Sequence, residues 1–468
     1  MPIAKREATA ILNSLNAGVV PRTGLRHIAV GRLREIAALK QDMDQIRDGG
    51  ATVRFVIGRF GSGKSFLLQL ARTYALESKF VVADADFSPE RRLHGTGGQA
   101  VATYRELMKN LSTQTRPDGN ALPAIIEKWI SNVQATVAAK QSLAPDAPEF
   151  ATAVKAEIVS TVNGMEELVH GFDFGTVISA YYQGYIDGND ELKGDAIRWL
   201  RGEFSTKSEA REALDVRSII DDDNYYDYLK VLGRFVRDVG YVGLLICLDE
   251  AVNLYKITHS VARTNNYEKV LSIVNDCLQG RAGSFGFIFG GTPEFLEDQR
   301  RGLFSYEALR TRLSGSRFVT DGMRDYSGPV LSLPPLATEE VYVFLQKVRD
   351  IHRDTVPGSR GLDDANIVAY MEDALQRSGA KEFSTPRDLV RDFVTLLNLL
   401  AQYPDKTWAD IAKSLPTAPG AIDKPSVSAG DAGSKTAPAA SSSIQSTTPP
   451  TPSANDSDPL ARFTDFKV

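Results

Sequence analysis

The sequence predicts an α/β fold in which helices flank a parallel sheet. Short apolar runs alternate along the chain with longer segments of helical periodicity, which is typical of this fold class. The runs are apolar throughout, as expected for strands that helices cover on both faces. The first run leads into a glycine-rich turn that opens a helical segment, so a strand–turn–helix unit is expected there. The five runs lie at residues 53–57, 80–83, 243–248, 285–289 and 330–333.

The order of these elements divides the chain into segments. Residues 1–50 are expected to form an N-terminal helical segment, and residues 51–110 the first part of the sheet domain. The interval between the second and third runs is too long for one crossover and carries helical patterns. We therefore expect a large helical insertion over 111–240. Residues 241–335 complete the sheet domain, and the purely helical pattern that follows predicts a C-terminal helical lid over 336–415.

The remaining residues, 416–468, have a different composition. Of the 42 residues from 416 to 457, 32 are Pro, Ser, Thr, Ala or Gly. Such a segment buries too little apolar surface to offset its ordering entropy, so a disordered tail is expected. Hydrophobic side chains return in 458–468. This short end is either a frayed terminus or a tethered peptide that docks on another protein.

The overall composition is that of an ordinary globular protein. The 468 residues include 54 Lys and Arg against 59 Asp and Glu, for a formal net charge of −5. This balance gives no overall basic field, so any contact with nucleic acid must come from a local patch. Two cysteines cannot cross-link a chain of this length, and no apolar run suits a signal peptide or a membrane helix. We expect a cytoplasmic protein with no membrane partner.

A phosphate-binding loop follows the first strand. Residues 58–65 read GRFGSGKS and match the pattern G-x-x-x-x-G-K-[ST] in full. Glycines let the backbone wrap around phosphates, and the N-terminus of the next helix directs amide hydrogens at them. Lys64 is expected to reach the β- and γ-phosphates, and the Ser65 hydroxyl to ligate Mg²⁺. The predicted nucleotide-binding residues are Gly58, Gly61, Ser62, Gly63, Lys64, Ser65 and Phe66.

Two further strand ends carry candidate catalytic residues. The third strand ends in Asp249 and Glu250. Asp249 is expected to hold Mg²⁺, and Glu250 to orient and deprotonate the attacking water, which favours hydrolysis over a kinase reaction. Thr292 follows the fourth strand and is a candidate for orienting the same water. The alternative for Thr292 is a hydroxyl that satisfies the turn before Pro293.

Candidate arginines occur in two later segments. Arg312 and Arg317 precede the fifth strand, and either could act as an arginine finger on the nucleotide of a neighbouring subunit. The alternative is that both are solvated or paired locally. In the lid, Thr385 is a candidate N-cap and Pro386 the first residue of a helix. Arg387 would then lie at the nucleotide-facing end of that helix.

Residues 88–99 form a glycine-rich segment after the second strand. Arg91, Arg92 and His94 make it a candidate for a mobile cationic loop that touches DNA phosphates, a neighbouring subunit or nucleotide. The alternative is a turn whose arginines pair with local carboxylates. The sequence has no zinc-finger spacing and no RNA-binding aromatic motif, so direct sequence readout is not predicted.

The order of these elements resembles that of the AAA+ superfamily of P-loop NTPases. The phosphate loop comes first, followed by the strand that ends in Asp249 and Glu250 and by the strand that ends near Thr292. The candidate arginine fingers and a helical lid that carries Arg387 come after them. The stretch GRLRE at 31–35 is similar to the Gly-Arg-x-x-Glu element of origin-recognition-type members, which contacts the adenine side. This resemblance implies that Val30 and Gly31 lie near the base, and that the bound nucleotide is ATP with Mg²⁺.

A narrower resemblance covers most of the first 400 residues. The matching stretches lie at 17–22, 27–32, 60–68, 85–95 and 104–108, and they look like the bacterial BREX-system ATP-binding domain family. Members of that family occur in anti-phage defence clusters, often beside helicases, nucleases or methyltransferases. The resemblance implies a defence or DNA-transaction ATPase and no particular substrate. We also expect a homo-oligomer, and a protein partner such as a helicase or nuclease from the same defence system.

Three functions remain open at this stage. The first, favoured by an intact Glu250, is an ATPase that assembles through arginine fingers and remodels or loads a partner on DNA. The second is a slow, nucleotide-gated switch or adaptor ATPase that signals to an effector. The third is a regulatory ATPase of DNA replication or transposition, which is weakened because no winged-helix pattern follows residue 401.

Overall fold

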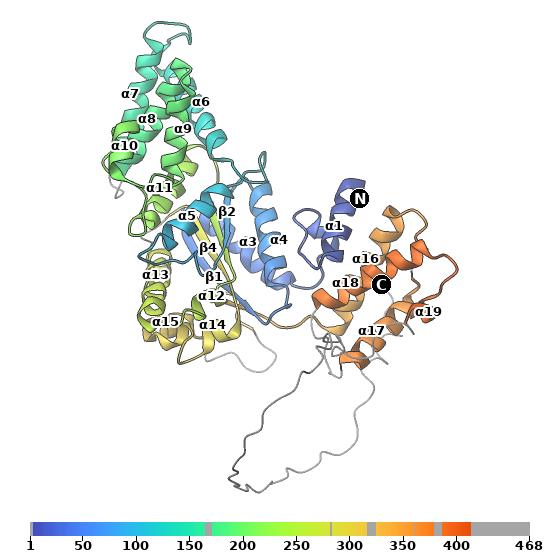
Figure 1. Cartoon of the computed structure of the whole chain (residues 1–468). Coiled ribbons are helices and arrows are strands. Elements are labelled where there is room, and N and C mark those ends of the chain that lie inside the picture. Colours follow the sequence, from blue (N-terminus) through green and yellow to red (C-terminus); the bar gives the residue numbers. More distant parts are fainter. Residues whose placement is uncertain are drawn as a thin grey trace, which may run out of the picture.

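A computed structural model describes residues 3–163, 171–280, 283–315, 324–360, 362–378 and 386–412. The chain forms a sheet covered by helices, a group of helices that projects from one end of it, and a second helical group beside the N-terminus (Figure 1). The predicted tail over 416–468 and its terminal peptide lie outside the described residues.

The sheet has five parallel strands in the order β2-β3-β4-β1-β5. The α/β class and all five predicted strands are therefore confirmed. Because the strands are parallel, their carboxyl ends meet at one edge, and β4 brings its end between those of β1 and β3. The bounds are β1 (Ala51–Gly58), β2 (Val81–Asp86), β3 (Leu244–Asp249), β4 (Phe285–Gly291) and β5 (Val330–Leu333).

Helices cover both faces of this sheet, as the unbroken apolar runs predict. Side chains alternate along β1, so that Phe55 and Ile57 enter one apolar cluster while Val56 enters the other. The face of Val56 is covered by α3 (Leu33–Arg47) and α4 (Lys64–Glu77). The opposite face is covered by α5 (Gln99–Lys109), α11 (Tyr225–Asp238) and α13 (Ser260–Leu278).

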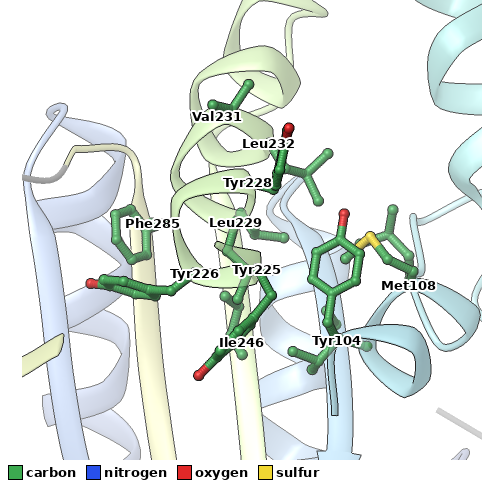
Figure 2. Close-up of a cluster of buried hydrophobic side chains, with 14 of the residues drawn as sticks. Tyr104, Met108, Tyr225, Tyr226, Tyr228, Leu229, Val231, Leu232, Ile246 and Phe285 are labelled. Carbon is green, nitrogen blue, oxygen red and sulfur yellow. The ribbon is translucent and has the colours of Figure 1, made fainter. Parts of the chain in front are cut away.

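Aromatic side chains of α11 fill the space between this helix and the sheet. Figure 2 shows Tyr226 beside Phe285 of β4, with Tyr104 and Met108 of α5 nearby. Tyr225 and Phe285 are 1% exposed, and burial of each such ring contributes about 1.5–3 kcal/mol to folding. Helix α11 falls inside the segment 111–240 predicted as an insertion, but its strongly amphipathic pattern packs it onto the sheet.

Seven helices, α5 to α11, lie between β2 and β3. Of these, α5 and α11 cover the sheet, and the five from α6 to α10 form the projecting group. They pack on one another and rise away from the sheet in Figure 1, so the predicted helical insertion is present. Their bounds are α6 (Leu122–Gln141), α7 (Phe150–Asn163), α8 (Gly171–Asp187), α9 (Asp190–Leu200) and α10 (Lys207–Leu214).

The predicted C-terminal helical lid also forms. Helices α16 (Thr338–Thr355), α17 (Asp364–Ser378), α18 (Pro386–Gln402) and α19 (Trp408–Ala412) follow β5 and pack around their own apolar cluster. Leu345 of α16 and Phe393 of α18 lie at the centre of that cluster and are fully buried. The lid is thus a separate packing unit from the sheet.

The N-terminal segment does not pack as one unit. Helices α1 (Lys5–Asn16) and α2 (Leu25–Ile28) contribute Ile11 and Ile28 to the apolar cluster of the lid. Helix α3 instead packs against the sheet. Figure 1 shows α1 beside α16 and α18, so residues from both ends of the chain meet there. The predicted segment 1–50 is therefore divided between two packing units.

Candidate active site

The predicted phosphate loop connects β1 to the N-terminus of α4. Gly61 and Gly63 have φ angles of 79° and 89°, which glycine adopts without a steric penalty. A Cβ on Gly58 would overlap the Ser62 hydroxyl, so the loop also needs glycine there. No described side chain caps α4, in contrast to α5, whose first amide groups bond to the Asp222 carboxylate. The free amides of α4 suit an anion such as a phosphate.

Lys64 lies inside this loop. Its Nζ donates to the Gly58 carbonyl at 2.9 Å and to the Arg59 carbonyl at 3.0 Å. Burial lowers the pKa of Lys64, and the charges of Asp249 and Glu250 act against that shift. Both bonds go to neutral carbonyl oxygens, so the ammonium group can exchange them for stronger, charge-assisted bonds to phosphate oxygens.

The Ser65 hydroxyl donates a hydrogen bond to Asp249 Oδ2 at 2.6 Å. The Asp249 carboxylate lies against Gly290 of β4. Glycine is required there, because a Cβ on Gly290 would overlap Asp249 Oδ1. A hydroxyl and a carboxylate side by side are hard oxygen donors that suit Mg²⁺, which keeps several water ligands. No cluster of three or more His, Cys, Asp or Glu ligands occurs in the described part of the chain. Ser65 and Asp249 alone supply few ligands, so they suit a Mg²⁺ ion that the phosphates of a bound nucleotide also ligate.

Glu250 has a left-handed backbone, with φ of 56°. For a residue other than glycine this conformation costs roughly 1–2 kcal/mol. Its backbone amide donates to Asp249 Oδ1 at 2.8 Å, and its exposed side chain lines the cavity beside the loop. Glu250 thus combines a strained backbone with a place in the wall of the cavity, which is where a water-activating base is needed.

A third carboxylate was missed by the sequence analysis. Asp86 ends β2 and lies in register with Asp249 of β3. Burial raises the pKa of Asp86, and the charges of Asp249 and Glu250 raise it further. The signal was present in the sequence, since β2 ends in an acidic residue. This acidic residue points to the site only when the strand order is known, because the order places the end of β2 beside the end of β3.

Thr292 follows β4, between the ends of β1 and β3 as predicted. Its side chain is 2% exposed and accepts a hydrogen bond from the Phe295 amide at 3.4 Å. It is therefore the N-cap of the short helix α14 (Pro293–Glu297). These contacts support the alternative kept for Thr292, a hydroxyl that satisfies the turn before Pro293.

Of the two candidate arginine fingers, Arg312 lies within the described residues and Arg317 does not. Arg312 lies on α15 (Glu307–Leu313), and its Nη1 donates to the Ala308 carbonyl of the same helix at 2.8 Å. It is not among the residues that line the cavity of its own chain. Arg317 lies outside the described residues. Whether either residue acts on a neighbouring subunit stays a prediction.

Arg387, in contrast, reaches the candidate site. It lies in the first turn of α18, is exposed, and lines the cavity beside the loop. Its positive charge contributes to the lowered pKa of Lys64, although burial is the larger cause. The N-cap predicted at Thr385 lies outside the described residues. The structure thus places a lid arginine near the phosphate loop, as the sequence analysis expected.

A cavity of about 160 Å³ extends from the phosphate loop into an apolar slot between the N-terminal segment and the lid. Val30 and Gly31, which the resemblance places near the base, are among the residues that line it. The Val30 amide and carbonyl have no hydrogen-bond partner among the described residues, so they are free to bond the edge of a base. The apolar walls that the sequence analysis missed come from two ends of the chain: Val19, Val20, Pro21, Leu336, Phe344 and Val390.

The segment 88–99 is held by two polar side chains, the buried Asn266 and the half-buried Asp222. Asn266, which is fully buried on α13, accepts bonds from two amides of this loop, each at 2.9 Å. Asp222 binds the amides where α5 begins. Arg91 donates to a backbone carbonyl and lies 3.7 Å from Glu106. For Arg91, these contacts support local pairing over a mobile loop, and no described ion pair involves Arg92.

Comparison with known proteins adds one result to this geometry. The model of a family described as "BREX system ATP-binding protein BrxC/D" matches residues 3–415. The match includes the phosphate loop, the helical insertion and the lid. No curated protein sequence matches the chain. Within the described part of the chain, every helix is too short or too polar to cross a membrane.

Proposed function

The chain belongs to the family of BREX system ATP-binding proteins BrxC/D, and from that premise we propose that it hydrolyses the ATP it binds. Family membership supports ATP binding within a phage defence system. Hydrolysis is the further step, and one observation carries it. Glu250 lines the same cavity as Lys64 and Ser65, and it follows Asp249, which accepts a hydrogen bond from Ser65.

The reaction follows from the roles of these side chains. The loop amides and Lys64 bind the β- and γ-phosphates, and Arg387 approaches them from the lid. Ser65 and Asp249 would hold Mg²⁺, which would supply positive charge that offsets the phosphates. Glu250 accepts a proton from a water molecule whose oxygen attacks the γ-phosphorus, and the bond to the β-phosphate oxygen breaks. The products are ADP and inorganic phosphate.

The apolar slot is proposed as the adenine site. A flat, aromatic base suits walls such as Pro21 and Phe344, and the unpaired backbone groups of Val30 suit its hydrogen-bonding edge. The cavity therefore has a polar end for phosphates and an apolar end for the base. This division of chemistry supports a nucleoside triphosphate over a simple phosphate ester.

The wider role is proposed as that of an AAA+ ATPase, cytoplasmic and homo-oligomeric, that remodels or loads a partner. Arg312 or Arg317 would act on the nucleotide of a neighbouring copy. The partner would be a helicase or nuclease of the same defence system. Contact with DNA through Arg91 and Arg92 would require Arg91 to release its local partners, the Asp86 carbonyl and Glu106.

One observation favours a second candidate, a slow nucleotide-gated switch. Thr292 is buried, caps α14 with its hydroxyl and is not among the residues that line the cavity, so it is not placed beside Glu250 to orient water. An ATPase with one orienting group is expected to turn over slowly. A switch of this kind would report bound ATP to an effector through the position of its lid.

Steady-state hydrolysis of ATP by the purified chain tests the proposal, measured alone, with duplex DNA and with single-stranded DNA. Turnover stimulated by DNA supports a motor or loader. Tight ATP binding with slow turnover that DNA leaves unchanged supports the switch. Absence of ATP binding in the presence of Mg²⁺ would contradict both.

A further inference from the structure

Arg32 lies where α3 begins and has an unusual conformation. Its φ is 61°, in the left-handed region that residues other than glycine rarely adopt. Its side chain is only 11% exposed and lines the same cavity as the phosphate loop. An arginine that is strained and largely buried costs stability unless its contacts offset that cost.

The guanidinium group of Arg32 joins two distant parts of the chain. Its Nη2 donates to the Ser62 carbonyl in the phosphate loop at 3.2 Å and to the Pro334 carbonyl just after β5. Its Nη1 lies 3.7 Å from the buried carboxylate of Glu35. Pro334 is the point at which the chain leaves the sheet for the lid. Arg32 therefore contacts the nucleotide-binding loop and the entrance to the lid with one group.

The lid and the sheet are joined at two chain crossings. Because α1 and α2 pack with the lid, the chain passes to the sheet at 29–32 and returns at 334–337. Lys347 of α16 donates to the Ala29 carbonyl at 2.7 Å, and the Glu340 carboxylate fills the space beside Gly31. Arg32 lies on one crossing and bonds to the other. If the lid rotates relative to the sheet, these contacts must either break or move together with the lid.

We propose that Arg32 is a positioning residue that couples occupancy of the phosphate loop to the orientation of the lid together with α1 and α2. The proposal rests on the proposed function only in that ATP binds the loop. Ordering of the loop around phosphates fixes the Ser62 carbonyl, which fixes the guanidinium group and, through Pro334, the start of the lid. The N-terminal helices then move with the lid as one body.

The side-chain chemistry explains why arginine suits this place. A planar guanidinium presents several N–H groups in a fixed fork, so one group can hold two carbonyl oxygens and face a carboxylate. A lysine ammonium keeps the charge but not this geometry. Arg32→Gln removes the positive charge and most of the N–H donors. Arg32→Lys keeps the charge but removes the planar arrangement of donors. Arg34 is exposed on the same helix, so Arg34→Gln is a matched control.

Resonance energy transfer between the sheet domain and the lid tests the coupling. Dyes are attached to Asp48→Cys at the end of α3 and to Gln402→Cys at the end of α18, both exposed positions. The native Cys247 and Cys277 are each 4% exposed and react slowly with the dyes. Transfer, ATP affinity and hydrolysis are measured in the full chain and in each variant, with thermal melting as the check on folding.

We expect ATP to change the transfer efficiency in the parent protein and in Arg34→Gln. In Arg32→Gln and Arg32→Lys, ATP should still bind measurably, while the change in transfer is lost and kcat falls on the order of 10-fold. An ATP-induced change that persists in both Arg32 variants would overturn the coupling role, as would a parent protein that binds ATP without any change. Failure of the parent to bind ATP would instead refute the proposed function.

Discussion

The Ser65 hydroxyl and Asp249 Oδ2 are 2.6 Å apart, although 184 positions separate the two residues in the sequence. The contact passes over the end of β4, which lies between β1 and β3, and Gly290 of β4 leaves room for the aspartate. It joins the first turn of α4 to the end of β3. The two residues that would hold the metal are therefore fixed by a helix N-terminus and a strand end of the sheet domain.

Lys64→Ala should weaken ATP binding by about 10- to 100-fold, because charge-assisted hydrogen bonds contribute roughly 1.5–3 kcal/mol. The lysine bonds only to loop carbonyls in the described structure, so its loss should leave the melting temperature nearly unchanged. Titration with a fluorescent ATP analogue measures the affinity. Unchanged affinity in a folded variant would remove Lys64 from the site.

Glu250→Gln should lower the hydrolysis rate by at least about 100-fold while ATP remains bound, because an amide cannot accept the proton of the attacking water. The φ of 56° at this position is kept by the substitution, since glutamine has nearly the same shape. Single-turnover hydrolysis and retention of labelled ATP on the protein measure the two effects. Glu297→Gln, on the exposed side of α14, is the control and should hydrolyse ATP normally.

The sequence predicted the parts of this protein that local patterns encode. Unbroken apolar runs identified the strands, and the full phosphate-loop pattern identified Lys64 and Ser65 because glycine spacing and helix start are local properties. Asp86 was missed because its role depends on which strand lies beside β3. The slot formed by Pro21 and Phe344 was missed for a similar reason, since hydrophobic residues carry no signal of the distant surface they face.

The lid shows the same limit in its packing. Its helices were predicted from their periodicity, but nothing in residues 1–28 indicated that α1 and α2 would complete its apolar cluster. Thr292 is a related case. Its position at the edge of the sheet followed from the sequence, whereas the direction of its hydroxyl depends on the turn into α14.

Gly290→Ala should impair Mg²⁺-dependent hydrolysis, because the new Cβ would displace the Asp249 carboxylate from its place beside Ser65. We expect a loss of about 10-fold or more in kcat/KM, which corresponds to roughly 1.4 kcal/mol. Titration of the rate with Mg²⁺ should show that a higher concentration is required. Gly194→Ala is the control, since a Cβ there meets no atom within 4 Å, and helix α9 should become slightly more stable. Equal Mg²⁺ requirements in both variants would show that Asp249 does not hold the ion.

Asp86→Asn should stabilise the folded chain at neutral pH, with a gain that disappears in acid. Burial, together with the charges of Asp249 and Glu250, raises the pKa of Asp86 above its ordinary value of 3.8. Between that value and the raised pKa, the folded state binds more protons than the unfolded state, so stability falls as the pH rises through this window. Above the window the charged carboxylate opposes folding, and the neutral amide removes that opposition. Thermal melting from pH 4 to pH 8 should show curves that separate as the pH rises. Curves that stay parallel would mean that Asp86 titrates as a free carboxylate.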